Sequence, residues 1–265
     1  MTFAMRPAFP ATDVPPTFAM INRMLTAGLL AGFAAGLLAA LLHFAFVQDL
    51  ILTGEAYETG QITHFGGTTS GVVTVEQGAH SHAEGAEAHS HDAGIPAPQG
   101  MMRNALTVLF STFVYVGYGI VLVAGFAFAA NVGIAVGPAQ GVLWGIAGFA
   151  AFQLAPAIGL PPELPGTLAA ELASRQVWWW GTALATAVGL GLLGYGKSIG
   201  IAALGLVLVA APHVIGAPQP DGYSGVAPPE LAAAFSARVL GVGLVVWAVM
   251  GGVAARFWTR PSEAG

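Results

Sequence analysis

Two pairs of histidines lie close together in the only long hydrophilic segment of the sequence, which runs from about Gln48 to Gly100. Each pair has the form His-Ser-His, and acidic residues lie between and after the pairs. Neutral imidazole is a ligand for Co, Ni, Cu and Zn ions, and carboxylates add negative charge. Because alternate residues of an extended chain point the same way, each pair presents two ring nitrogens to one ion. The histidines are His80, His82, His89 and His91.

The residues around these histidines are mainly glycine, alanine and serine. We therefore expect a flexible loop that holds an ion loosely and exchanges it easily. His-rich tracts are typical of metal-binding segments, so the pattern favours the capture of a divalent transition metal. The alternative is a solvated low-complexity linker that binds metal only incidentally.

The composition predicts an integral membrane protein. Of the 265 residues, 55% are hydrophobic and only 8% are charged, whereas about 25% of an ordinary soluble domain is charged. The net charge of -5 gives no reason to expect nucleic-acid binding. The chain has no cysteine, which excludes disulfides, Cys-based zinc sites, iron–sulfur clusters and thiol catalysis. A transition metal must therefore be held by His, carboxylate, Met or backbone oxygen.

We expect an all-α membrane protein with about six transmembrane helices, five being the alternative, and one long His-rich loop outside the membrane. Residues 1–22 contain several prolines and no apolar periodicity, which predicts a disordered tail. The expected divisions after this tail are a first transmembrane helix at 23–47, the polar loop at 48–103, a helical membrane domain at 104–258 and a second tail at 259–265. The apolar runs of the membrane domain are about Ala105–Asn131, Gln140–Ile158, Val177–Gly196, Ile199–Gly216 and Leu231–Arg256.

Short polar or proline-containing segments separate these apolar runs. Only Lys197 and Ser198 lie between the third and fourth of them, which predicts a tight hairpin or one kinked element. Pro156 and the prolines that follow it are expected to end the second run, because proline cannot donate a helical hydrogen bond. For the same reason Pro212 is expected to break the end of the fourth run.

Three glycines of the first predicted helix repeat at every fourth residue: Gly28, Gly32 and Gly36. This spacing places them on one helix face and leaves that face bare, so another helix can approach closely. The alternative is a coincidence in a chain that contains 37 glycines.

The distribution of Lys and Arg predicts the orientation in the membrane. With six spans, one side holds five of these residues and the other side holds Arg103 and Arg175. By the positive-inside rule, the side with more basic residues is cytoplasmic. Both termini are then expected in the cytoplasm and the His-rich loop outside. The five basic residues are Arg6, Arg23, Lys197, Arg256 and Arg260.

A second set of candidate metal ligands is expected on the same outer side. His43 and His213 lie near the ends of two predicted spans, where an ionisable side chain is costly and is therefore a functional candidate. Glu55 and Glu58 follow the first span, and Glu163 lies in a proline-rich loop. We expect these side chains to converge on one face and form an entry site. For each histidine the alternative is a structural hydrogen bond between helices.

Three other features have structural interpretations. Trp178–Trp180 are expected to form an aromatic anchor at the membrane interface. Arg238, inside the last predicted span, is expected to snorkel outward or to pair with an acidic loop residue. Glu171 and Arg175 have the i, i+4 spacing of a surface ion pair.

No motif in the sequence indicates catalysis. The chain contains no Walker loop before a helix, no His-Glu-x-x-His and no Gly-x-Ser-x-Gly. No pair of carboxylates lies within the apolar runs, as a proton relay would need. We therefore expect a protein that is not an enzyme and does not hydrolyse ATP itself.

Taken together, these features resemble the CbtA family, a proposed cobalt transporter subunit of bacteria. The resemblance covers nearly the whole chain from Met20 onward, and it includes Arg23 before the glycine-rich helix as well as the His-rich loop. The longer motifs that carry it are Glu55-Ala56-Tyr57-Glu58, Gly141-Val142-Leu143-Trp144-Gly145-Ile146-Ala147-Gly148-Phe149, Leu154-Ala155-Pro156, Gly159-Leu160-Pro161-Pro162-Glu163-Leu164-Pro165-Gly166, Arg175-Gln176-Val177-Trp178-Trp179 and Pro212-His213-Val214-Ile215-Gly216-Ala217-Pro218.

The resemblance implies a cobalt importer linked to cobalamin biosynthesis in the bacterial cytoplasmic (inner) membrane. It also implies a partner, the small single-span membrane subunit CbtB, which carries its own histidine motif. It supplies no ligand set, so the candidate residues above rest on the sequence alone. We expect Co2+ as the transported ion and no permanently bound cofactor, with Ni2+, Zn2+ or Cu2+ open because ligand type does not separate them. The alternative function is a non-transporting metal-binding or sensor subunit that assists another permease.

Overall fold

The computed structural model describes residues 16–63 and 100–260, and these residues form helices without a β-strand. Five helical segments are long and apolar enough to cross a membrane. A sixth apolar helix, Ile199–Ile215, has 17 residues, which is at the short end of the range of about 17–25 for a membrane span. The predicted all-α membrane fold is confirmed. The five longer segments are Met20–Phe46, Met101–Asn131, Pro138–Gly159, Leu172–Tyr195 and Pro229–Trp258.

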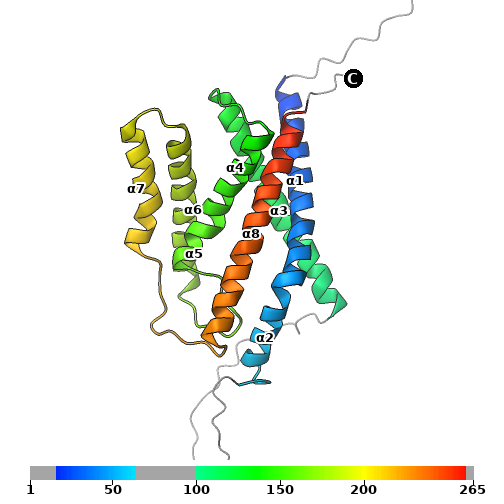
Figure 1. Cartoon of the computed structure of the whole chain (residues 1–265), viewed down its shortest axis with the longest axis vertical. Helices are drawn as coiled ribbons and strands as arrows, with labels where there is room; N and C mark the ends of the chain where they lie inside the picture. The colour runs from blue at the N-terminus through cyan, green and yellow to red at the C-terminus, as the bar shows by residue number, and fades with distance from the viewer. Residues whose placement is uncertain (1–15, 64–99, 261–265) are drawn as a thin grey trace, which may run out of the picture.

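The described chain runs back and forth along one direction (Figure 1). The start of α1 and the end of α8 lie at one end of the bundle, which we call the terminal end; the opposite end, where α2 lies, we call the α2 end. α7 runs back from α6 toward the α2 end, so the described chain makes six helical passes, of which five have the length and composition of a membrane span. The helices are α1 (Pro16–Phe46), α2 (Gln48–Glu58), α3 (Met101–Asn131), α4 (Pro138–Phe149), the π-helical turn η1 (Ala150–Leu154), α5 (Ala155–Gly159), α6 (Leu172–Tyr195), α7 (Ile199–Ile215) and α8 (Pro229–Trp258).

The first helix begins earlier than expected. α1 starts at Pro16, so the last part of the predicted disordered tail 1–22 is helical and that boundary is wrong. Proline suits the first turn of a helix, because the N–H that it lacks has no helical partner there. The following residues up to Met24 contain no helix breaker. Residues 1–15 and 261–265 lie outside the described part of the chain.

The predicted polar loop 48–103 also begins with a helix, α2, which follows α1 after a break at Val47. Val47 is buried together with Leu164 and Phe235, and the apolar side chains of Leu50 and Ile51 pack against them. These contacts explain why a segment with several polar residues is ordered: one of its faces covers the loop before α6 and the start of α8.

Pro156 does not end its helix, contrary to the expectation from the sequence. The helical path continues from α4 through η1 into α5 and ends at Gly159. A proline removes one hydrogen bond and its ring clashes with the carbonyl four residues earlier. The wider π-helical turn lies immediately before it, from Ala150 to Leu154, and π-turns are a common way to absorb such a defect inside a helix.

Pro212 is likewise inside its helix and does not break it. α7 continues to Ile215, and it ends where Gly216 takes a positive φ of 88°. Glycine adopts a positive φ without steric cost, so it suits the point where the chain leaves the helix. The tight hairpin predicted at Lys197 and Ser198 is confirmed, because α6 and α7 pack against each other along their length.

The bare face predicted for the first helix is also confirmed. A Cβ atom built at Gly32 would collide with backbone atoms of Val116 and Tyr115 in α3, and one at Gly36 would collide with Thr112. The two helices therefore touch backbone to backbone. In a membrane such close contact stabilises association through packing, since lipid removes the hydrophobic driving force.

α8 joins this helix pair to the rest of the bundle. It packs against both α1 and α4, and its Trp247 and Met250 are fully buried next to Phe126 of α3 in the main core cluster. Gly145 of α4 lies against the backbone of Trp247, so the α4–α8 crossing is as close as the α1–α3 contact. This core fixes the ends of α1, α3, α5 and α8 that carry the candidate site.

Candidate metal-handling end of the helix bundle

Charge is divided between the two ends of the bundle (Figure 1). Every Asp and Glu among the described residues lies at the α2 end: Asp49, Glu55, Glu58, Glu163, Glu171, Asp221 and Glu230. The described basic residues of the terminal end are Arg23, Lys197, Arg256 and Arg260. The α2 end also holds three arginines, and each of them donates a hydrogen bond to a carboxylate or a backbone carbonyl. An end with this excess of carboxylates attracts cations.

Glu55, a predicted metal ligand, is paired with Arg103. The guanidinium of Arg103 at the start of α3 donates to both carboxylate oxygens, at 2.8 and 2.6 Å. Such a two-pronged contact is the strongest geometry for this kind of pair, and it ties α2 to α3. Both side chains remain about one-third exposed, at 37% and 30%, so solvent weakens the pair and leaves it open to exchange.

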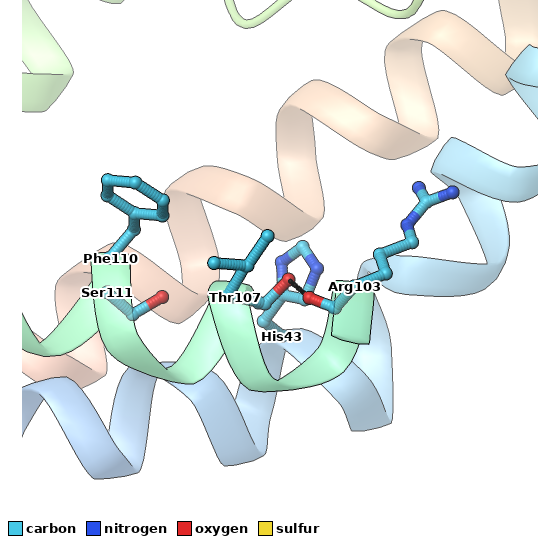
Figure 2. Close-up of a pocket in the computed structure, with 6 residues that line it drawn as sticks. His43, Arg103, Thr107, Phe110 and Ser111 are labelled. Carbon is cyan, nitrogen blue, oxygen red and sulfur yellow. Dashed lines mark hydrogen bonds between the residues drawn. The ribbon is translucent and has the colours of Figure 1, made fainter. Parts of the chain in front are cut away.

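His43, the second predicted ligand, lies beside an open pocket of about 360 Å³ between α1 and α3. Figure 2 shows its ring next to Thr107, whereas the guanidinium of Arg103 is turned away from the ring, on the side where Glu55 binds it. Thr107 donates its hydroxyl to the Arg103 carbonyl at 3.0 Å. Ser111 also lines the pocket, so one imidazole and two hydroxyl groups are the polar side chains available beside Arg103.

Glu163 lies in the connection between α5 and α6, where the sequence places it. Its carboxylate accepts a hydrogen bond from Arg175 at 3.0 Å, and the two side chains are 29% and 27% exposed. The preceding Pro162 carbonyl accepts a hydrogen bond from Ser236 of α8 at 2.7 Å, and Leu164 is buried. The loop is therefore held against α8, and the carboxylate faces away from that anchor toward α6.

His213 lies in the last turn of α7, against the edge of Trp178, with the ring centroids 6.2 Å apart. The indole N–H of Trp178 donates to the Pro212 carbonyl at 3.2 Å, and the Gly216 amide donates to the same oxygen at 3.0 Å. A metal site that combined the imidazole with this carbonyl would have to displace one of these donors. Trp178 thus joins α6 to α7. The sequence predicts only an anchoring role at the membrane interface for Trp178–Trp180.

Glu58 ends α2 and is exposed, with its side chain next to Gly166 in the α5–α6 connection. Within residues 16–63 and 100–260, no three His, Asp or Glu side chains come close enough together to hold a metal ion. The structure therefore places the predicted ligands of the membrane body at one end but in separate positions. Their role as ligands stays a prediction, as does that of His80, His82, His89 and His91, which lie outside the described residues.

Two predicted charge contacts are replaced by others. Glu171 does not pair with Arg175, which binds Glu163; its carboxylate caps α6 by accepting hydrogen bonds from the amides of Ala173 and Ser174, at 2.8 and 2.7 Å. These bonds favour the charged form and lower the pKa of Glu171. The cap takes precedence because the first amides of a helix have no helical partner.

Arg238 of α8 is exposed, and among residues 16–63 and 100–260 it forms no ion pair with an acidic side chain. Its guanidinium donates to the backbone carbonyl of Phe46 at 3.1 Å, where α1 ends before the break at Val47. A cation at a helix C-terminus is favourable, because the last carbonyls carry partial negative charge and lack helical partners. Arg238 therefore fixes the point at which α2 turns away from α1.

Several polar residues of the α2 end were not singled out from the sequence. Thr107 and Ser111 are ordinary residues of an apolar helix by composition, and only the fold distinguishes them, because it places them in the lining of the same pocket as His43. Gln153 did give a signal, since it is a polar amide within an apolar run. It lies in η1 and lines a second cavity.

Comparison with known proteins agrees with this membrane architecture. A family model described as "Probable cobalt transporter subunit (CbtA)" matches residues 21–259. Neither a curated protein nor a solved structure matches the chain. The match covers both the helical body and the motifs at the α2 end, and the chain therefore belongs to the CbtA family of probable cobalt transporter subunits.

Proposed function

We propose that this chain takes up Co2+ across the bacterial cytoplasmic membrane, with its α2 end facing outward. The observation that carries the proposal is the separation of charge: the described acidic residues all lie at the α2 end, and that end also carries the described residues on either side of the segment 64–99. The His-rich sequence is therefore attached to the end that attracts cations. The basic residues of the terminal end favour a cytoplasmic position.

In this proposal the metal passes through three kinds of group. His80, His82, His89 and His91 collect the ion at low concentration. Glu55 and Glu58 then relay it toward the helical body, where His43, Glu163 and His213 admit it. Two of these carboxylates are held by arginines, so an arriving cation must exchange with a guanidinium, which keeps binding reversible.

We infer that the chain works with a CbtB-like partner, a small single-span membrane subunit with its own histidine motif. The family description calls its members transporter subunits, which supports an assembly of more than one chain. The protein then moves an ion and catalyses no reaction. Ni2+ or Zn2+ would fit the same nitrogen and oxygen ligands.

Uptake of radioactive cobalt by cells that express the chain, with and without the partner, tests this function. We expect accumulation above background only when the chain is present, and more with the partner. If cells with both subunits take up no more cobalt than cells with neither, although both reach the membrane, the chain is not a transporter. Binding of cobalt by the purified chain in that case would favour the sensor or assisting subunit.

Two variants separate the collecting and admitting groups. Replacement of His80, His82, His89 and His91 by alanine should reduce uptake mainly at low cobalt, because a flexible collector raises local concentration without lying on the path. His213→Gln keeps hydrogen bonding but removes a good metal ligand, so it should lower uptake even at saturating cobalt. Normal uptake by His213→Gln protein that inserts in normal amounts would show that this histidine is structural.

A further inference from the structure

A cavity of about 480 Å³ opens beside the loop that carries Glu163, and its walls come from α3, η1, α5, α6 and α8. Its lining includes prolines of that loop and several aromatic side chains. The lining residues on which the argument rests are Tyr118, Phe152, Gln153, Glu163, Arg175 and Trp179. None of the candidate histidines of the described chain lines it.

The mouth of the cavity carries charge. Glu163 and Arg175 form an ion pair there, with 3.0 Å between the guanidinium nitrogen and the carboxylate oxygen. The backbone beside Glu163 is held in place, because the Ser236 hydroxyl donates a hydrogen bond to the carbonyl of the preceding Pro162. The carboxylate is thus held at a rigid entrance, while its partner is a long side chain that can swing aside.

The wall of the cavity includes Gln153, whose amide oxygen lacks a hydrogen-bond donor among the described residues. The Oε1 atom of Gln153 is buried and accepts no hydrogen bond from the described part of the chain; it lies against Gly243 of α8. A buried carbonyl without a donor is costly, and in a native protein it calls for an explanation such as an ion or a water. The last side-chain torsion of glutamine is broad, so a small rotation turns this oxygen toward the cavity.

The π-helical turn η1 brings Gln153 to this position. Gln153 lies six residues before the end of α5 at Gly159, which corresponds to about 9 Å along a helix with a rise of 1.5 Å per residue. Its amide is therefore below the rim that carries Glu163. π-turns of this kind are found frequently at functional sites.

We propose that this cavity is the vestibule through which a hydrated divalent cation enters the helical body, with Glu163 at its mouth and Gln153 at its inner end. The proposal rests on the function given above and names the route. Six water molecules occupy about 180 Å³ at about 30 Å³ each, so an ion with a full first shell fits the volume. The oxygens of a carboxylate and an amide are hard ligands that suit an ion which keeps most of its water.

The side chains that line the cavity suit a cation that passes through it better than one that is stored there. Among the described residues, no imidazole or thioether lines the cavity, so none of them replaces the inner water shell of a transition metal with soft or nitrogen ligands. Tyr118, Phe152 and Trp179 offer ring faces and edges, and the negative face of an aromatic ring attracts cations. Arg175 holds Glu163 while the vestibule is empty, and the ion takes its place on the carboxylate.

Thiol labelling of the full chain tests whether the cavity is open to water. The natural chain has no cysteine, so Ala157→Cys, which lies in the wall, supplies the only thiol. A charged, membrane-impermeant maleimide added from the α2 side should label it quickly. Leu154→Cys is the matched control: Leu154 is 42% exposed but does not line the cavity, so we expect it to face lipid and react slowly. Equal rates for both thiols would overturn the vestibule.

Uptake measurements then test the role of the amide. Gln153→Leu, with a side chain of similar size, should lower cobalt uptake about tenfold, the effect expected from losing one contact to a charged species. Gln140→Leu changes the same kind of side chain at the start of α4, at the terminal end, and should leave uptake unchanged. Uptake by Gln153→Leu protein at the unmutated rate, at normal membrane levels, overturns this inference alone. Absence of uptake by the unmutated chain with its partner overturns both the proposed function and the route.

Discussion

Arg103 and Arg175 occupy two of the carboxylates that the sequence marks as metal ligands. Each guanidinium binds one carboxylate at 3.0 Å or less, and all four side chains keep between 27% and 37% of their surface exposed. A guanidinium in such a place neutralises the charge of the carboxylate until a cation that binds the carboxylate more tightly displaces it. In the proposed function the arginines therefore compete with the metal for these carboxylates, which keeps the binding of the ion weak enough for release.

Arg103→Gln should free Glu55 and raise cobalt uptake at low metal. A partly exposed ion pair contributes about 0.2–1 kcal/mol, so the gain is at most about fivefold. The measurement is the initial rate of radioactive uptake at a cobalt concentration below saturation. Arg256→Gln removes one positive charge at the terminal end and should not raise the rate. A lower rate in Arg103→Gln would mean that the pair is needed to place α2.

At the scale of the helices, the close contacts of α1 with α3 and of α4 with α8 determine where the site residues lie. These contacts run along glycines, so the backbones themselves touch and little adjustment is possible. α6 and α7 form a separate hairpin that meets the rest mainly through η1 and α5. The cavity proposed as a vestibule lies where this hairpin joins the tightly packed helices.

Gly32→Ala should destabilise the contact between α1 and α3. Its new Cβ would meet backbone atoms of Val116, which cannot rotate away, and overpacking of this kind costs about 1–3 kcal/mol. Gly117→Ala is the control, since a Cβ at Gly117 on α3 meets nothing within 4 Å. Thermal unfolding of the purified chain in detergent should show a lower midpoint for Gly32→Ala only. A midpoint equal to that of the control would contradict the backbone contact.

The start of α6 should depend on pH through Glu171. Its carboxylate accepts two amide hydrogen bonds, and the pKa of Glu171 is lowered from the ordinary value of 4.5. A group whose pKa is lower in the folded chain stabilises it above the ordinary value, and this contribution is lost as the pH falls through the folded pKa. Hydrogen exchange of the Ala173 amide, corrected for its intrinsic pH dependence, should lose protection below about pH 4.5. In Glu171→Gln this pH step should be absent; a step that persists would assign it to another group.

At the scale of the whole molecule, the described acidic side chains all lie at the α2 end, and the basic side chains described at the terminal end form no ion pair within residues 16–63 and 100–260. Figure 1 shows both described ends of the chain at the terminal end together with the α6–α7 turn. For a membrane protein this distribution predicts the orientation, and for a cation carrier it concentrates the ion at the side from which it is taken. The two consequences agree only if the α2 end is outside.

A reporter that is active only outside the cytoplasm should show activity when it is fused within residues 85–94 and none when it is fused after Lys197. The second fusion is the internal control, because Lys197 lies in the turn at the terminal end. The opposite pattern would reverse the orientation. The His-rich segment would then receive or store metal inside the cell.

The sequence by itself determined the class of protein, the helical turn-back at Lys197 and the bare helix face at Gly32. The reason is physical: a bilayer requires about 20 apolar residues for a helix that crosses it, so composition and run length are direct measures of the fold. Glycine spacing is informative for the same reason, since every fourth residue returns to the same helix face. The family resemblance was also available from local motifs, and the match over residues 21–259 confirms it.

Only the tertiary structure decided which groups meet. The sequence does not distinguish the roles of Glu55, Glu163 and Glu171. In the structure, Glu55 and Glu163 bind arginines of other segments, whereas Glu171 caps its own helix. These partners depend on distances between segments that are far apart along the chain, such as Glu55 and Arg103. Pro156 shows the same limit in the backbone, because proline usually ends a helix. Here a π-helical turn packed against Trp247 of α8 absorbs the defect, and it places Gln153 in the wall of a cavity. The packing energy of the helix outweighs the local preference of proline.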